Sequence, residues 1–453
     1  MTATLRAAGP GGDVLRAAGP GGDVLRAAGP GGDVLRAADL GGTVSGLLDV
    51  DVASRGRFAQ LCGLGLRDNP RRAHLVVSRV LGKHVPVVPD AVLGAGAAVG
   101  DAVAAVLGNE VPGLVIGYCE TATGLGHAAA DRLGAAYLHT TRRLHPGVPV
   151  AAAFEEEHSH AVAHALQPVG PVALDVPGAL VLVDDELTSG RTALNTIAEL
   201  DLCWPRERYV VATLLDARTP AARAAFAGRA EALGVRVDVA AVLATELTLP
   251  ADVLGRAAAA RAALPAAAPP PSGAPGSVVV HEGLWPAGVP TGARHGLTPA
   301  GSARLADAAD AVAAALVPVL AGSRGVLVLG TEELMHAPTV IGARLSGRLP
   351  GVPVTTQSTT RSPVHAADDP GYALRRSLAF PAPDDPARVS RVHNLADPAA
   401  VPAAGPWSDQ RADDVVVVVD APAADCAAMG EALRPFAARA VHLVTVPIAE
   451  PGA

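Results

Sequence analysis

The stretch Val181-Leu-Val-Asp-Asp-Glu-Leu-Thr-Ser-Gly-Arg-Thr192 (VLVDDELTSGRT) decides which fold the chain is expected to adopt. It continues an apolar run from Ala179, and this run predicts a buried strand over 179–183. Asp184 and Asp185 follow at the carboxyl end of that strand, and a Thr-Ser-Gly turn leads into a predicted helix over 192–200. We therefore expect two adjacent carboxylates beside a helix N-terminus at one edge of a sheet.

This arrangement suits a sugar phosphate. Two adjacent carboxylates can accept hydrogen bonds from the vicinal hydroxyls of a sugar. The backbone N–H groups of residues 187–192 would form a nest that faces the phosphate at the helix N-terminus. The same segment supplies hydroxyl donors and a glycine that would let the chain approach the phosphate without a Cβ clash: Thr188, Ser189, Thr192 and Gly190.

A rival interpretation exists, because an apolar strand that ends in Val-Asp-Asp-Glu also opens the receiver domains of response regulators. Those domains need a lysine far downstream of the acids, whereas Lys83 is the only lysine of this chain. They also lack a Thr-Ser-Gly turn at this point. The phosphate-binding interpretation is therefore preferred.

Strands and helices alternate on both sides of the decisive stretch. Further strands are predicted over 113–118, 136–140 and 209–215, and a helix over 126–133. Apolar strands that alternate with helices indicate a mostly parallel sheet with helices on both faces. The first folded part is thus expected to be an α/β domain.

The segment 181–192 resembles the signature with which type I phosphoribosyltransferases bind phosphoribosyl pyrophosphate (PRPP). The resemblance implies that Asp184 and Asp185 hold the ribose hydroxyls, and that Mg²⁺ is bound mainly through PRPP with these two acids as further ligands. The common signature has Thr directly after Gly, whereas this chain has Arg191 there and Thr192 one position later. The residues that would cradle the 5′-phosphate are Glu186, Leu187, Thr188, Ser189, Gly190, Arg191 and Thr192.

A second loop, Glu120–Gly126, lies between a predicted strand and a predicted helix. In this fold class the corresponding loop holds the pyrophosphate, and small residues with free N–H groups fit that task. Arg142 and Arg143 follow the next strand and would neutralise the departing pyrophosphate, although a solvated basic pair is the alternative. The loop residues assigned to the pyrophosphate are Thr121, Ala122, Thr123 and Gly124.

Several longer stretches narrow the resemblance to the phosphoribosyltransferases of tellurium-resistance-type biosynthetic gene clusters. They are Asp68–Arg72, Val77–Pro86, Gly117–His127, Phe154–Ala161 and Val183–Ile197, and Thr360–Pro363 resembles the signature of the TRSP domain that follows this type of transferase. The resemblance places Lys83 and His84 on the substrate side, within a hood over the ribose. In the C-terminal domain it favours Thr360, Arg361 and Ser362 as site residues, and Glu333, which follows the apolar run 325–330, is a further candidate.

The domain boundaries follow from composition. Residues 1–44 contain a repeated Leu-Arg-Ala-Ala-Gly-Pro-Gly-Gly-Asp-Val unit with too few apolar side chains to form a core, and we expect them to be disordered. The transferase domain would span 45–261, a Pro- and Ala-rich linker 262–277, and a second α/β domain 278–453. Its predicted elements are strands over 325–330 and 414–419 and a helix over 338–345.

A histidine- and glutamate-rich segment, 154–160, lies between the two loops, with His164 close behind it. A metal site is one interpretation of His158, His160 and His164 with the three glutamates. The histidines lack the intervening glutamate of the HExxH pattern, so a lid that closes over PRPP is the more economical hypothesis.

The overall composition limits the partners. A net charge of −8 and a pI near 5.9 argue against nucleic acid as the main partner. The four cysteines are far apart in the sequence, no secretory signal is present, and no apolar run appears long enough to cross a bilayer. We expect a cytoplasmic protein with small-molecule substrates and no membrane partner, and leave a homodimer open.

Family membership implies an enzyme, a pentosyltransferase that moves ribose 5-phosphate from PRPP to an unidentified, base-like acceptor in a nucleoside-like metabolite pathway. The alternative from another class is a PRPP-binding regulatory protein without turnover, because a fold and a loop do not guarantee chemistry. A third interpretation gives the C-terminal domain a separate reaction of the same pathway.

Overall fold

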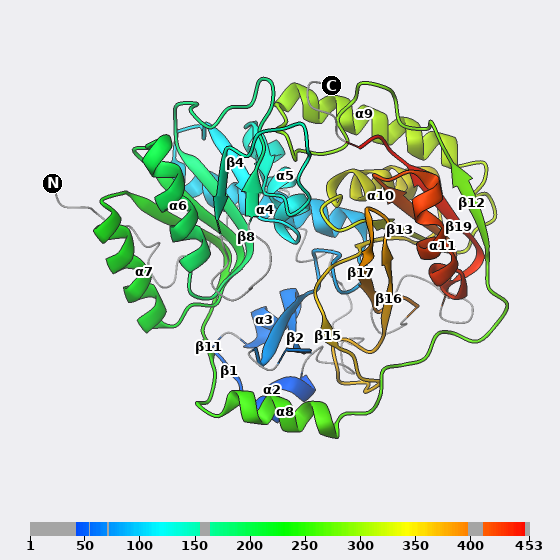
Figure 1. Ribbon diagram of the computed structural model, residues 1–453. Coiled ribbons are helices and arrows are strands. Elements are labelled where there is room, and N and C mark those ends of the chain that lie inside the picture. The colour runs from blue at the N-terminus through cyan, green and yellow to red at the C-terminus, as the bar shows by residue number, and fades with distance from the viewer. Residues whose placement is uncertain (1–41, 54, 70–71, 155–163, 397–410, 449–453) are drawn as a thin grey trace.

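The computed structural model describes residues 42–53, 55–69, 72–154, 164–396 and 411–448. The decapeptide repeats up to residue 41 and the expected lid and metal residues 155–163 lie outside these ranges. Two parallel sheets dominate the structure (Figure 1). We call residues 42–263 the N-terminal unit, which ends with α8 (Val253–Ala263), and residues 277–448 the C-terminal unit, which begins with β12 (Ser277–His281).

The sheet of the N-terminal unit has the order β10-β9-β8-β4-β5 and only parallel pairs among the described residues. Helices α4 and α5 lie between this sheet and the C-terminal unit, and α6 and α7 lie on its outer side (Figure 1). This arrangement confirms the predicted α/β architecture. The bounds are β4 Leu114–Gly117, β5 Tyr137–His139, β8 Leu180–Leu187, β9 Tyr209–Asp216, β10 Val237–Ala244, α4 Pro89–Leu107, α5 Ala122–Leu133, α6 Arg191–Cys203 and α7 Pro220–Leu233.

The sheet of the C-terminal unit has the order β12-β19-β18-β13-β14, again with parallel pairs throughout the described part. The second predicted α/β layer structure is therefore confirmed. A hairpin of β16 (Ser377–Ala382) and β17 (Asp385–His393) stands apart from this sheet. The other bounds are β13 Val326–Gly330, β14 Val354–Ser358, β18 Ala412–Val419, β19 Ala437–Thr445, α9 Pro299–Leu316, α10 His336–Arg348 and α11 Ala427–Leu433.

A small antiparallel sheet joins the two units. Its order is β15-β2-β3, with β2 (Cys62–Arg67) and β3 (His74–Ser78) from the N-terminal unit and β15 (Val364–His365) from the C-terminal unit. We call it the hood sheet. One continuous hydrophobic core includes buried side chains of both units, so the two units pack as one body.

The N-terminal unit also contains several shorter elements. They are α2 (Gly42–Leu48), α3 (Arg55–Leu61), and the strand pairs β1 (Asp51–Val52) with β11 (Leu247–Thr248) and β6 (Ala152–Phe154) with β7 (His164–Leu166). The expectation that residues up to 44 are disordered is wrong for 42–44. These residues begin α2, because the degraded last repeat places Val44 and Leu48 on one helix face that is fully buried.

The expectation that no apolar run could span a bilayer is also wrong by length and composition, because α4 has 19 residues and a mean hydropathy of 1.6. The helix begins with Pro89 in its first turn and ends at Gly108, whose φ is 69°. Half of its apolar window is buried, against α5, β9, β10 and α10. Its apolar character is therefore accounted for by packing in the core.

The contact between α4 and α5 depends on a glycine. A Cβ at Gly96 would lie 2.3 Å from the Cβ of Ala128 and 2.9 Å from the carbonyl oxygen of Leu125. We expect Gly96→Ala to lower the free energy of unfolding by about 1–3 kcal/mol, as overpacked cores do. Gly228→Ala on the open face of α7 should instead be neutral or stabilising, because no atom lies within 4 Å of its Cβ position. Chemical denaturation of both variants measures the difference, and equal stability would contradict the tight helix contact.

Candidate functional site

The two acids of the decisive stretch lie on a strand that is longer than predicted. Strand β8 continues past Val183 to Leu187, because β9 runs beside it with Asp184 opposite Thr213 and Leu187 opposite Asp216. The prediction that the strand ends at residue 183 is therefore wrong. Asp184 and Asp185 are half-buried, and an Asp184 carboxylate oxygen accepts the N–H of Asp185 at 2.9 Å.

The turn after β8 leads directly into α6, as predicted. Thr188 and Ser189 are exposed, and Gly190 adopts a left-handed conformation (φ 74°) at the helix N-cap. A Cβ at Gly190 would lie 2.4 Å from the Phe226 ring, so the glycine is needed for this turn and for contact with α7. The predicted reason, room for a phosphate, stays a prediction, and Gly190 does line the cleft described below. The first turn of α6 still directs backbone N–H groups outward beside the two acids.

A cleft of about 660 Å³ opens in front of these residues, a size typical of small-molecule sites. The carboxyl end of β8 and the start of α6 form one wall, and the hood sheet and the loop before β15 form others. Every predicted phosphate residue from Glu186 to Thr192 lines it. Its complete lining is Arg67, Arg72, Leu75, Val76, Lys83, His84, Tyr118, Cys119, Glu120, Thr121, Arg142, Asp184, Asp185, Glu186, Leu187, Thr188, Ser189, Gly190, Arg191, Thr192, Ala193, Val211, Arg361, Ser362 and Pro363.

The predicted pyrophosphate loop is shorter than expected. Helix α5 begins at Ala122, and not near Gly126, so only Cys119, Glu120 and Thr121 of this loop reach the cleft. The N–H of Ala122 donates to Tyr118, and the N–H of Thr123 donates to Glu120. The structure does not bring Ala122, Thr123 and Gly124 into the cleft as predicted, because they are buried in the first turn of α5. Thr121, by contrast, lines the cleft as predicted.

Lys83 and His84 lie on the hood side of the cleft, as the resemblance implied. The Lys83 ammonium donates a hydrogen bond to the Thr121 hydroxyl and so ties the hood to the first loop. His84 is buried, and burial followed by repulsion from Lys83 lowers its pKa well below the usual value. His84 is therefore neutral at pH 7.

The two arginines after β5 separate. Arg142 lines the cleft, and its guanidinium lies 3.0 Å from Nε2 of His164. Arg143 turns away and forms an ion pair with Asp420 at 2.8 Å, inside a second, smaller cavity. Of the two arginines predicted to face the pyrophosphate, the structure places only Arg142 in the cleft, because Arg143 pairs with Asp420 and Asp384.

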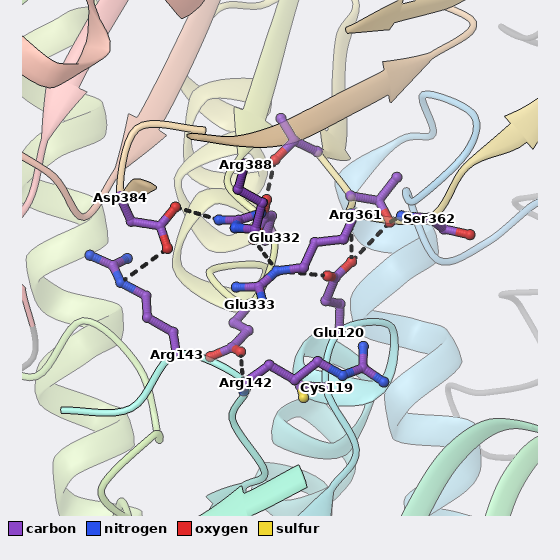
Figure 2. A network of polar contacts seen from close by, with 12 residues as sticks. Cys119, Glu120, Arg142, Arg143, Glu332, Glu333, Arg361, Ser362, Asp384 and Arg388 are labelled. Carbon is purple, nitrogen blue, oxygen red and sulfur yellow. Dashed lines mark hydrogen bonds and ion pairs between the residues drawn. The ribbon is translucent and has the colours of Figure 1, made fainter. Parts of the chain in front are cut away.

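Residues of the C-terminal unit complete the cleft. Glu333 accepts hydrogen bonds from the Thr141 hydroxyl at 2.7 Å and from the N–H of Arg142 at 2.8 Å. Glu120 accepts hydrogen bonds from the Thr360 hydroxyl at 2.9 Å and from the N–H of Arg361 at 3.2 Å. Figure 2 shows the contact of Glu333 with Arg142 and the contacts of Glu120 with Arg361, and Ser362 lies beside the cleft. Glu333 lines the smaller second cavity and not the cleft. It supports the cleft through its hydrogen bonds to Thr141 and Arg142.

Glu186, which directly follows the two aspartates, carries a buried carboxylate oxygen. Its Oε2 atom is buried without a hydrogen-bond partner among the described residues. Burial and the neighbouring Asp185 raise its pKa to about 7, against the opposing effects of Arg67, Arg72 and Lys83. The carboxyl group of Glu186 therefore changes its charge near neutral pH.

One group of possible metal ligands lies outside the cleft in the described part of the chain. His127, Asp131 and His336 lie together where α5 meets α10. The two imidazole rings stack 3.6 Å apart at an angle of 14°, so their lone pairs run nearly parallel and do not converge on one ion. His164 of the predicted histidine cluster bonds to Thr140 and Arg142. Asp184 and Asp185 are the carboxylates in the cleft that suit Mg²⁺, which prefers oxygen ligands.

Sequence reasoning missed four contributors to the site. Glu120 and Tyr118 belong to the first loop, and Arg67 ends the hood strand β2. Asp420 directly follows the apolar strand β18, and this position at the carboxyl end of a parallel strand was a usable signal. Tyr118 and Glu120 follow strand β4 in the same way, and only Arg67 has no sequence pattern that sets it apart.

Comparison with known proteins agrees with this geometry. Residues 61–246 match the family described as phosphoribosyl transferase, and residues 291–434 match the TRSP domain found C-terminal to it. No curated protein shows significant similarity to the chain.

Solved adenine phosphoribosyltransferases resemble parts of the chain. The enzyme from Giardia lamblia, complexed with 9-deazaadenine, is 22% identical over 34% of this chain and 80% of its own, with a TM-score of 0.24. The enzyme from Rhodothermus marinus is 16% identical over 42% of this chain and 97% of its own, with a TM-score of 0.28. Because these scores lie below 0.5, the fold assignment rests on the sheet order and the family match.

The family match, together with the α/β fold and the cleft, identifies a phosphoribosyltransferase, an enzyme of the pentosyltransferase class. Within that class, residues 61–246 belong to the phosphoribosyl transferase family, and a TRSP domain follows them over 291–434.

The raised pKa of Glu186 predicts a pH-dependent stability. The unfolded chain loses this proton near pH 4.5 and the folded chain near pH 7, so the stabilising contribution is complete below the first value and is lost as pH rises through the second. We expect Glu186→Gln to raise Tm at pH 8 and to change it little at pH 4.5. Thermal unfolding at both pH values tests this, with Glu199→Gln on the exposed side of α6 as the control. An equal change in Tm at both pH values would refute the assignment.

Proposed function

We propose that the protein transfers ribose 5-phosphate from PRPP to a base-like acceptor and releases pyrophosphate. The observation that carries this proposal is the position of Asp184 and Asp185 beside the N-terminus of α6 in one open cleft. A ribose 5-phosphate held there would present its hydroxyls to the acids and its phosphate to the helix N-terminus. The class of the acceptor and a nucleoside-like pathway are part of the proposal.

The reaction breaks the bond between the anomeric carbon and the pyrophosphate oxygen and forms a bond from that carbon to an acceptor nitrogen. Positive charge develops on the ribose ring and negative charge on the leaving group, as in glycoside hydrolysis. The half-buried aspartates lie where they can hold the hydroxyls of the ribose and stabilise its positive charge. Arg142 and Lys83, which line the other side of the cleft, suit the leaving pyrophosphate.

Magnesium fits this site through the two aspartates and the phosphate oxygens of PRPP. A bound Mg²⁺ would neutralise charge on the pyrophosphate as it leaves. The chain's own contribution is to orient the ribose and to hold the leaving group. The neutral His84 and the apolar Leu75 and Val76 lie on the hood side, where a flat acceptor ring would enter.

The two aspartates provide the direct test. Asp184→Asn combined with Asp185→Asn should weaken PRPP binding about 100-fold or more, because charge-assisted hydrogen bonds to the ribose hydroxyls and the contacts to Mg²⁺ are lost. Calorimetry with PRPP and Mg²⁺ measures the affinity. Asp252→Asn, an exposed acid at the start of α8, is the matched control and should bind PRPP like the unaltered protein. Unchanged affinity in the double variant would remove both residues from these roles.

A further inference from the structure

A short segment of the C-terminal unit, Thr360–Pro363, forms part of the cleft wall. Arg361, Ser362 and Pro363 line the cleft opposite the residues of β8. Its contacts with the N-terminal unit converge on one residue, Glu120, which precedes Thr121 in the first loop. The segment and this loop are thus held together although 240 positions separate Thr360 from Glu120.

Both ends of this segment are fixed. The backbone of Thr360 exchanges two hydrogen bonds with Arg391 on β17, at 2.8 and 2.9 Å. At the other end, β15 follows immediately and pairs with β2 in the hood sheet. The Tyr372 hydroxyl accepts a hydrogen bond from the N–H of Leu66 and donates one to the carbonyl of His365. These two bonds link β2 to β15 and stabilise their pairing. A segment held in this way can define the position of the loop that it contacts.

The charge of Glu120 requires a partner. Glu120 is 6% exposed and lies beside Thr121, at the end of the cleft assigned to the pyrophosphate. An uncompensated buried carboxylate is costly and would also repel an anionic ligand. The Arg361 guanidinium lies 3.4 Å from one Glu120 oxygen and 2.7 Å from Glu332 (Figure 2). Arg361 therefore supplies the compensating charge.

We propose that Thr360 and Arg361 are positioning residues for the pyrophosphate end of the PRPP site, so that the TRSP domain completes the transferase cleft. They would act through Glu120 in two ways. Their hydrogen bonds fix the loop Cys119–Thr121, which Lys83 holds from the hood side. The guanidinium also cancels a negative charge that would otherwise face the leaving group. This inference rests on the proposed PRPP function.

Two ligands that differ only in the pyrophosphate group separate this role from a general loss of structure. We expect Arg361→Gln to weaken PRPP binding tenfold or more, which corresponds to about 1.4 kcal/mol, and to change the affinity for ribose 5-phosphate by less than threefold. Calorimetry on the full chain with Mg²⁺ measures both. Arg388→Gln is the matched control, because Arg388 pairs with the same Glu332 and does not contact Glu120. The control should bind both ligands as the unaltered protein does.

A double-mutant cycle identifies the route of the effect. In a Glu120→Gln background, Arg361→Gln should cost less than threefold in PRPP affinity, because the charge that it compensates is gone. Thr360→Val, a milder change of similar volume, should repeat the selective loss for PRPP if Arg361→Gln folds poorly. Equal losses for both ligands, no loss for PRPP, or an unreduced effect of Arg361→Gln in the Glu120→Gln background would each overturn the inference. If the unaltered protein fails to bind PRPP, the proposed function itself fails.

Discussion

The carboxylate of Glu333 ties the carboxyl ends of the two parallel sheets together. It follows β13 of the second sheet and accepts hydrogen bonds from Thr141 and Arg142, which follow β5 of the first. Burial opposes its ionisation, but Arg294, His139 and these hydrogen bonds outweigh burial and lower its pKa to about 2. Glu333 is thus charged at all ordinary pH values. Because the charge cannot be left unpaired, it fixes how the ends of the two sheets meet and where the cleft opens.

Much of the fold could be predicted from the sequence because long parallel strands are apolar along their whole length. The predicted strands over 113–118 and 209–215 match β4 and β9 within one residue at each end. The carboxyl end of β8 was placed too early, because charged residues do not by themselves end a strand whose neighbour continues. The start of α5 was placed too late, since a Thr-Ala-Thr-Gly sequence reads as a loop until burial shows it to be a helix.

The candidate site could be predicted in part. The acid pair and the turn before α6 are contiguous in the chain. The sequence of this one segment was therefore enough to predict them. The separate directions of Arg142 and Arg143 depend on Asp420, which lies 277 positions beyond Arg143 in the chain. The hydrogen bond between Glu120 and Thr360 likewise joins residues that lie 240 positions apart in the chain. Such pairings between units leave no periodicity or spacing in a single sequence. The TRSP segment itself was predicted to matter through its resemblance, without any indication of its partner.

The third strand of the hood sheet has a consequence for how the chain reaches its final form. β15 pairs with β2 although almost 300 residues separate Val364 from Arg67 along the chain. During synthesis, Leu66 and Arg67 emerge long before their partners exist, so the edge of β2 remains open until translation passes residue 365. The transferase cleft is therefore among the last parts of the protein to form. A protein truncated at the predicted linker, 262–277, would lack both β15 of the hood sheet and the wall residues Arg361–Pro363.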